Sequence, residues 1–224
     1  MTKNNPHKNY GTRGFTLLEL LIVIAILAIL SAVAIFVLNP AETLRETRDS
    51  HRISDLATLK TAIALYLTKA TSTIALDGNA SINCRNGTTP KLFYSLPSNS
   101  PGGTITDASF DGGNFTSVSQ VTNANLPLTD GTGWIKINLS SLVGGSPISN
   151  LPVDPTNTIT DLANVTSTDQ VYRFACDKND NTFEINARLE SSSFANKLSQ
   201  DGGNNSNLFE SGTKLNILGS GADF

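Results

Sequence analysis

One carboxylate lies inside a long apolar run near the N-terminus. Residues 15–38 contain a single charged side chain, Glu19, and neither glycine nor proline. An ionised carboxylate in a membrane helix costs a few kcal/mol and usually has a partner. The run holds no lysine or arginine, but a free amine on Phe15 of a neighbouring copy could serve if the chain were cut after Gly14. The chemistry that this spacing permits is an ion pair between copies.

The two cysteines, Cys84 and Cys176, are too few for a structural zinc site, which requires four N or S ligands. The histidines, His7 and His51, lie before the apolar run and soon after it, so they do not complete a site. In an exported domain such a cysteine pair most simply forms one disulfide. The alternative is two unrelated buried thiols.

A turn rich in Asp and Asn, residues 177–181, contains Asp177 and Asp180, which supply the hard oxygen ligands that calcium prefers. Calcium takes about six to eight oxygens, and the spacing of an EF-hand loop is absent. We therefore predict a plain hairpin turn and no cofactor, with calcium at this turn as the weaker alternative.

Catalytic signatures are missing from the sequence. It contains no Gly-x-Ser-x-Gly, His-Glu-x-x-His, P-loop or dinucleotide fingerprint. His51 is the only histidine after the apolar run, which makes a Ser-His-Asp arrangement improbable. The sequence predicts that the protein is not an enzyme.

Residues 15–38 are long enough to cross a membrane as a helix. At 1.5 Å per residue they extend about 36 Å, against a hydrocarbon core of about 30 Å. A secretory signal has a shorter apolar core followed by a small-x-small cleavage site, which is not found here. Two readings remain: a plain single-span anchor, or a helix exposed by removal of the basic segment 1–14.

The stretch Gly14-Phe15-Thr16-Leu17-Leu18-Glu19-Leu20 decides between them, because it resembles the cleavage and methylation motif of type IV pilins and type II secretion pseudopilins. In that family a prepilin peptidase cuts after the glycine and methylates the new N-terminal residue. The resemblance implies a leader at 1–14, methylation of Phe15, and pairing of Glu19 with the amine of a neighbour during assembly. The chain departs from many members in having no Gly or Pro within the apolar helix.

The resemblance also implies a role and partners. The chain would be a structural subunit of a pilus or pseudopilus, polymerised through its apolar helix with copies of itself and related pilins. It would meet the prepilin peptidase and an inner-membrane assembly platform. It would be a single-pass membrane protein with an extracytoplasmic domain, and after assembly part of a surface or envelope-spanning filament. Lys/Arg counting leaves the orientation open, so orientation rests on the leader and the cysteine pair.

Residues 39–70 are predicted to form an amphipathic stalk helix. Asn39 is a capping residue and Pro40 suits the first helical position. A helical stripe of apolar residues consists of Ile53, Leu56, Leu59, Ile63 and Leu67. The charged residues are expected on a solvated face: Arg45, Glu46, Arg48, Asp49, Arg52, Asp55 and Lys60.

Residues 71–224 are predicted to form a β-rich head, so that the whole is an α+β fold with a long N-terminal helix packed on a small antiparallel sheet. Five strands are expected, at 92–96, 115–118, 134–139, 171–176 and 182–189, the last two as a hairpin. The polar tail from Ser191 is expected to wrap the surface or to be mobile. Leu-Pro-Val-Asp-Pro at 151–155 resembles the C-terminal part of major pseudopilins, although Thr156-Asn157 replaces the usual Trp-Gly.

The net charge of the chain is −3, and the basic residues are scattered, which gives no basis for nucleic-acid binding. The competing function class is a solitary membrane-anchored binding domain that does not polymerise. Gly14 and Glu19 discriminate between the classes, because a plain anchor needs neither.

Overall fold

The computed structural model describes residues 14–70, 74–97, 117–159 and 167–219. Contacts between residues divide the chain into two compact units, residues 1–43 and residues 44–224. Helix α2 begins in the first unit and continues into the second, which also contains the head.

Helix α1, Leu17–Leu38, forms most of the first unit. It has 22 residues, which corresponds to about 33 Å, and none of its residues is buried. Within the described residues, the helical stretch Leu17–Lys69 is the one candidate membrane span, and none of its most apolar window is buried. Such a surface is unfavourable in water and requires lipid or another apolar surface around it.

A break at Asn39 separates α1 from α2, Pro40–Lys69. Asn39 adopts the left-handed conformation with φ at 38°, and its Oδ1 accepts a hydrogen bond from the Glu42 amide at 3.4 Å. Pro40 then occupies the first helical position, where its missing N–H is not needed. The helix therefore ends and restarts, as the Asn-Pro pair predicted.

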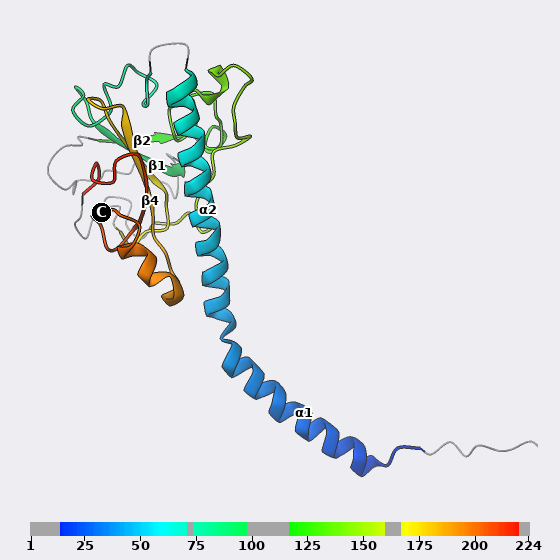
Figure 1. The fold of residues 1–224 in the computed structure, drawn as a ribbon. Coiled ribbons are helices and arrows are strands. Elements are labelled where there is room, and N and C mark those ends of the chain that lie inside the picture. The colour runs from blue at the N-terminus through cyan, green and yellow to red at the C-terminus, as the bar shows by residue number, and fades with distance from the viewer. Residues whose placement is uncertain (1–13, 71–73, 98–116, 160–166, 220–224) are drawn as a thin grey trace, which may run out of the picture. The chain divides into compact units, whose positions relative to one another are not determined.

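The apolar stripe of α2 packs against the head. Leu56, Leu59 and Ile63 are fully buried, whereas Ile53 and Leu67 at the edges of the stripe are partly exposed. Figure 1 shows α2 lying along the sheet. The spacing of the apolar residues thus correctly predicted the face of the helix that the head covers.

The sheet has five strands in the order β2-β1-β3-β4-β5. Their bounds are β1 Lys91–Pro97, β2 Ser117–Val121, β3 Arg173–Asp177, β4 Thr182–Ala187 and β5 Phe209–Gly212. Neighbours from β1 to β5 are antiparallel, which confirms the α+β class. The edge strand β2 is parallel to β1, so the sheet is not purely antiparallel as expected.

Alternation along the strands divides the sheet into two buried faces. One face contributes residues such as Phe93, Phe174 and Phe183 to the core that contains the stripe of α2. The opposite face contributes Leu92, Tyr94 and Ala175 to a second cluster that contains C-terminal residues. A strand buried on both faces explains why β1 reads as a nearly continuous apolar run.

The strand expected at 134–139 is absent. Trp134, Ile135 and Ile137 are fully buried, but the segment is irregular and one isolated bridge joins Asp130 to Asn138. A short 3₁₀ helix, η2, follows at Leu139–Ser141. The Trp134 indole donates to the Pro152 carbonyl at 2.9 Å. The alternation of apolar residues here indicates burial but not strand pairing. Neighbouring loops provide the hydrogen-bond partners of the backbone in this segment.

The polar tail lies on the surface in its first part, as one of the two expectations had it, but it also contributes a strand that was not expected. It forms a 3₁₀ helix, η3, at Ser192–Ser199 and then the edge strand β5. The strand expected at 115–118 lies later, at 117–121, and residues 115–116 are outside the described residues. The β3–β4 hairpin lies where it was predicted.

Candidate processing and assembly site

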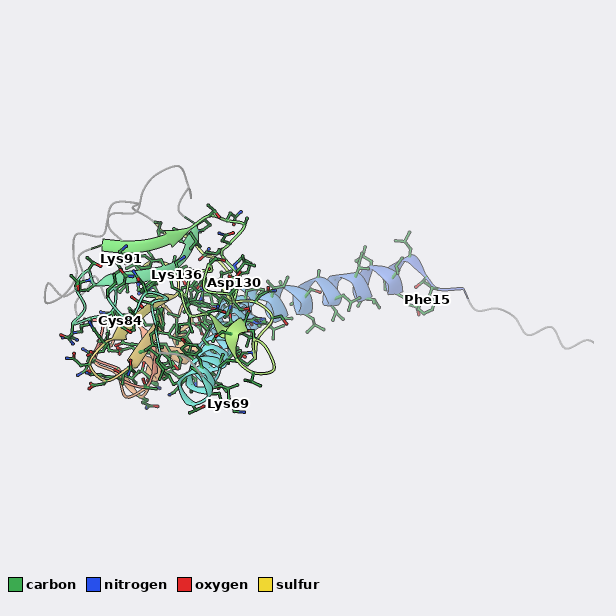
Figure 2. All side chains as sticks on the ribbon, turned by 90° about the horizontal axis from the view of Figure 1, so that it is seen from above. Phe15, Lys69, Cys84, Lys91, Asp130 and Lys136 are labelled. Atoms are coloured by element: carbon green, nitrogen blue, oxygen red, sulfur yellow. A yellow bond between two sulfur atoms is a disulfide. The ribbon has the colours of Figure 1, made fainter. Side chains whose placement is uncertain are left out.

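The Gly14–Phe15 bond lies outside regular secondary structure, just ahead of α1. Phe15 is 87% exposed, and Thr16, the residue before the helix, has extended backbone angles. Figure 2 shows Phe15 at the start of a helix whose side chains project outward. A peptide bond in this setting is free of secondary-structure hydrogen bonds that would shield it from a protease.

The residue type at position 14 is not required by the fold. A Cβ at Gly14 would meet nothing within 4 Å, and its φ is not in the left-handed region that favours glycine. The fold would therefore accept alanine there, so any need for glycine must come from a partner molecule.

Glu19 and Thr16 form a reciprocal capping box at the start of α1. The Glu19 carboxylate accepts hydrogen bonds from the Thr16 amide and the Thr16 hydroxyl, both at 2.8 Å. In return the Glu19 amide donates to Thr16 Oγ1 at 3.2 Å. These bonds satisfy donors that the first turn of a helix otherwise leaves unpaired.

This geometry changes the expectation for Glu19. Within a single copy its carboxylate already accepts two hydrogen bonds, so it does not depend on another molecule for a donor. Thr16 was not singled out from the sequence, although the Thr-x-x-Glu spacing at 16–19 is the signal of a capping box. The helix N-terminus also favours a negative charge at this position.

The comparisons with known proteins bear on this same segment. The family model described as "Prokaryotic N-terminal methylation motif" matches residues 10–35. The chain carries this motif. It is the hallmark of the prepilin-type signal of type IV pilins and pseudopilins, and it supports a type IV pilin-like protein. Comparisons with curated proteins and with solved structures found no match.

The methylation motif ends within α1, and the head holds the remaining predicted site residues. Cys84 and Cys176 are bonded to each other, with their Cα atoms 4.7 Å apart. Both are fully buried. The disulfide predicted for this pair is therefore present, and it joins the segment after α2 to strand β3.

The weak calcium candidates, Asp177 and Asp180, are bridged by a lysine. Lys214 Nζ lies 3.0 Å from a carboxylate oxygen of each. Burial works to raise the pKa of Asp177, but hydrogen bonds from Asn86, Lys214 and the Asn179 amide outweigh it and lower that pKa below its usual range. The described residues contain no group of three or more candidate metal-ligating side chains. The ammonium group already supplies the positive charge that this turn attracts.

A buried ionic cluster joins α2 to the head. Arg52 is fully buried, and its Nε lies 2.7 Å from a carboxylate oxygen of Asp154. Its Nη1 lies 2.8 Å from Asp49 and 2.6 Å from Glu190. Burial works to lower the pKa of Arg52, but these carboxylates outweigh it and raise that pKa above its usual value.

The cluster corrects the expectation of a solvated charged face. Asp49 is fully buried and accepts hydrogen bonds from the amides of Glu190 and Ser191. Arg48 donates twice to Glu190, and Arg48 and Arg52 together outweigh burial and lower the pKa of that carboxyl to about 2. The sequence signal for these partners was the Asp of the Leu-Pro-Val-Asp-Pro segment, but its pairing with α2 spans 102 residues.

Proposed function

We propose that the chain is the precursor of a type IV pilin-like structural subunit, cut between Gly14 and Phe15 by a prepilin peptidase that also methylates the new amine. The observation that carries this proposal is the methylation motif, which lies on a capped, wholly exposed apolar helix. Residues 1–14 are then the leader, α1 spans the membrane and later the filament core, and the head lies outside the cytoplasm.

Polymerisation buries α1. A helix about 33 Å long with no buried residue is stable in lipid, but outside the membrane it must be covered by other apolar surfaces. Copies of the same helix provide such surfaces. Related pilins and an inner-membrane assembly platform are the further partners of this proposal.

Pairing through Glu19 fixes how far neighbouring copies of α1 are shifted along the filament axis. In an unassembled copy its carboxylate caps its own helix through Thr16. After cleavage, the Phe15 amine of a neighbour shifted along the axis forms an ion pair with that carboxylate, in which both partners carry a charge, whereas the Thr16 donors are neutral groups. Assembly then brings together two opposite charges that would each otherwise be buried without a counter-charge.

The test is the mass of the protein extracted from membranes of cells that carry the processing machinery. We expect loss of residues 1–14 and the addition of one methyl group on Phe15. A mature protein that retains the leader would overturn the proposal, as would cleavage at another bond. Electron microscopy of shed material then separates a filament subunit from a solitary anchored domain, since the latter forms no filaments.

A further inference from the structure

Two carboxyl groups lie together in the interior of the head, on the face of the sheet that α2 does not cover. Glu184 on β4 and Glu210 on β5 are 0% and 2% exposed. Glu184 pairs with Gly212 and Asn186 pairs with Glu210, so the two glutamates are diagonal neighbours on one face. The two carboxyl groups are close enough that each shifts the pKa of the other.

The donors around the pair leave one oxygen unsatisfied. Glu184 Oε2 accepts bonds from the amides of Ile217 and Leu218, at 2.8 and 3.0 Å. Glu210 Oε2 accepts one from the Asn205 amide at 2.8 Å. Glu184 Oε1 is buried without a hydrogen-bond partner. A buried acceptor in this position requires a donor, and a proton held by the pair supplies one.

Three charged groups among the described residues act on the pair or lie on its face of the sheet. Asp201, in the segment before β5, adds a negative charge near Glu210. Arg85, after α2, acts on Glu184 from a distance, but its Nη1 donates to the carbonyls of Asn216 and Ile217. Arg173 on β3 lies on the same sheet face, across Asn186 from Glu210. Two like charges in contact in a buried site cannot both ionise.

We propose that Glu184 and Glu210 share one proton in the folded head, and that this protonated pair is a pH-sensitive clasp that holds the C-terminal segment on the sheet. The proton lies between Glu184 Oε1 and the facing oxygen of Glu210, and the pair keeps one negative charge. Burial and the nearby negative charges raise the pKa of Glu210 to about 9, and burial also raises the pKa of Glu184.

The clasp closes one side of the head. Ile217 and Leu218, whose amides bind Glu184, are both 2% exposed and pack in the cluster that contains Leu92, Tyr94 and Ala175. Loss of the proton would place two charges beneath these residues. The C-terminal segment would then loosen and expose the apolar face of the sheet.

The sign of the pH effect follows from linkage. The pKa of Glu210 in the folded head lies above its ordinary value of 4.5. The proton on the pair therefore stabilises the folded head fully below pH 4.5, and this stabilisation is lost as the pH rises through about 9. Glu210→Gln provides a permanent N–H donor toward Glu184 and removes the titration of residue 210. Between pH 5.5 and 7.5 the ratio of unfolding constants, wild type over Glu210→Gln, should rise about tenfold per pH unit, or about a hundredfold in all.

The measurement is urea unfolding of the full chain in detergent, followed by fluorescence of Trp134, the single tryptophan, which is buried in the head. Glu190→Gln is the matched control. The pKa of Glu190 is lowered to about 2, so this variant should be destabilised equally at both pH values. A second measurement uses the wild-type protein alone. At pH 7 its infrared spectrum should contain the band of a protonated carboxylic acid.

Three results would overturn the proposal. The first is a ratio of unfolding constants that does not change with pH. The second is the absence of the infrared band at pH 7. The third is stabilisation of the wild type, but not of Glu210→Gln, by millimolar Ca²⁺, because the pair would then hold a cation in place of the proton. Glu184→Gln should reproduce the behaviour of Glu210→Gln, since it places the same donor between the two groups.

Discussion

At the scale of single residues, Glu19 has a role within one copy that the sequence reading overlooked. Its carboxylate caps α1 through the Thr16 amide and hydroxyl. A glutamine at position 19 can make the same capping box, whereas a leucine cannot. Substitutions of Glu19 can therefore separate two effects: the start of the helix, which needs an acceptor, and the proposed pairing between copies, which needs a charge.

Glu19→Gln should insert in the membrane and be cleaved much as wild type, while filament assembly falls sharply. Loss of the carboxylate leaves the amine of a neighbour buried without its counter-charge, which costs about 3–5 kcal/mol per contact. Electron microscopy of shed filaments measures assembly, and immunoblots of the membrane fraction measure insertion and cleavage.

Two variants complete that experiment. Glu19→Leu should also fail to assemble, and Thr16→Ala should retain assembly better than either, because it removes the cap and keeps the charge. If Glu19→Gln and Glu19→Leu both assembled as well as wild type, the carboxylate would not be an assembly determinant, and a plain membrane anchor would fit better.

At the scale of elements, α2 is attached to the head by more than its apolar stripe. Asp154 reaches the helix through Arg52, and Asn157 and Thr156 amides in turn bind Asp154. The buried guanidinium holds together segments that are far apart along the chain. The burial of these charges is tolerated because every one has an opposite partner at hydrogen-bond distance.

Arg52→Met should destabilise the head by about 3–5 kcal/mol, because the buried carboxylates of Asp49 and Asp154 lose their counter-charge. Lys60→Met is the control, since Lys60 is exposed on the same helix and its loss should change stability by less than about 0.5 kcal/mol. Urea unfolding followed by Trp134 fluorescence compares the two. Equal midpoints would show that the ionic cluster does not stabilise the head.

At the scale of the whole molecule, the chain combines a unit that needs an apolar environment with a head that has its own core. The head contains loops with little regular structure, such as residues 122–138. The disulfide offsets part of the conformational freedom of such a chain. It joins residues 92 positions apart, and Arg85 donates beside it to the Cys176 carbonyl at 2.7 Å.

Removal of the disulfide should cost about 4–5 kcal/mol in the loop-entropy model. The double variant Cys84→Ala, Cys176→Ala should unfold at a lower urea concentration than wild type. Reductant should shift the wild-type midpoint in the same direction and leave the double variant unchanged. A wild-type midpoint that did not respond to reductant would contradict this expectation.

Local sequence patterns were enough to predict the elements whose formation depends on residues close together in the chain. The Asn-Pro break, the stripe of α2, strand β1 and the β3–β4 hairpin all follow from periodicity, capping and turn residues, whose physical effects act over a few positions. The sequence by itself also determined the methylation motif, because a contiguous segment is what a processing enzyme recognises.

Only the tertiary structure decided where charged and polar residues lie. A sequence pattern does not distinguish buried Arg52 from exposed Lys60, because the difference is made by Asp154 and Glu190, more than 100 residues away. Strand β5 and the Glu184–Glu210 pair were missed for the same reason. Burial of a polar group is favourable only once its partner is in place, and that partner is set by the fold of the whole head.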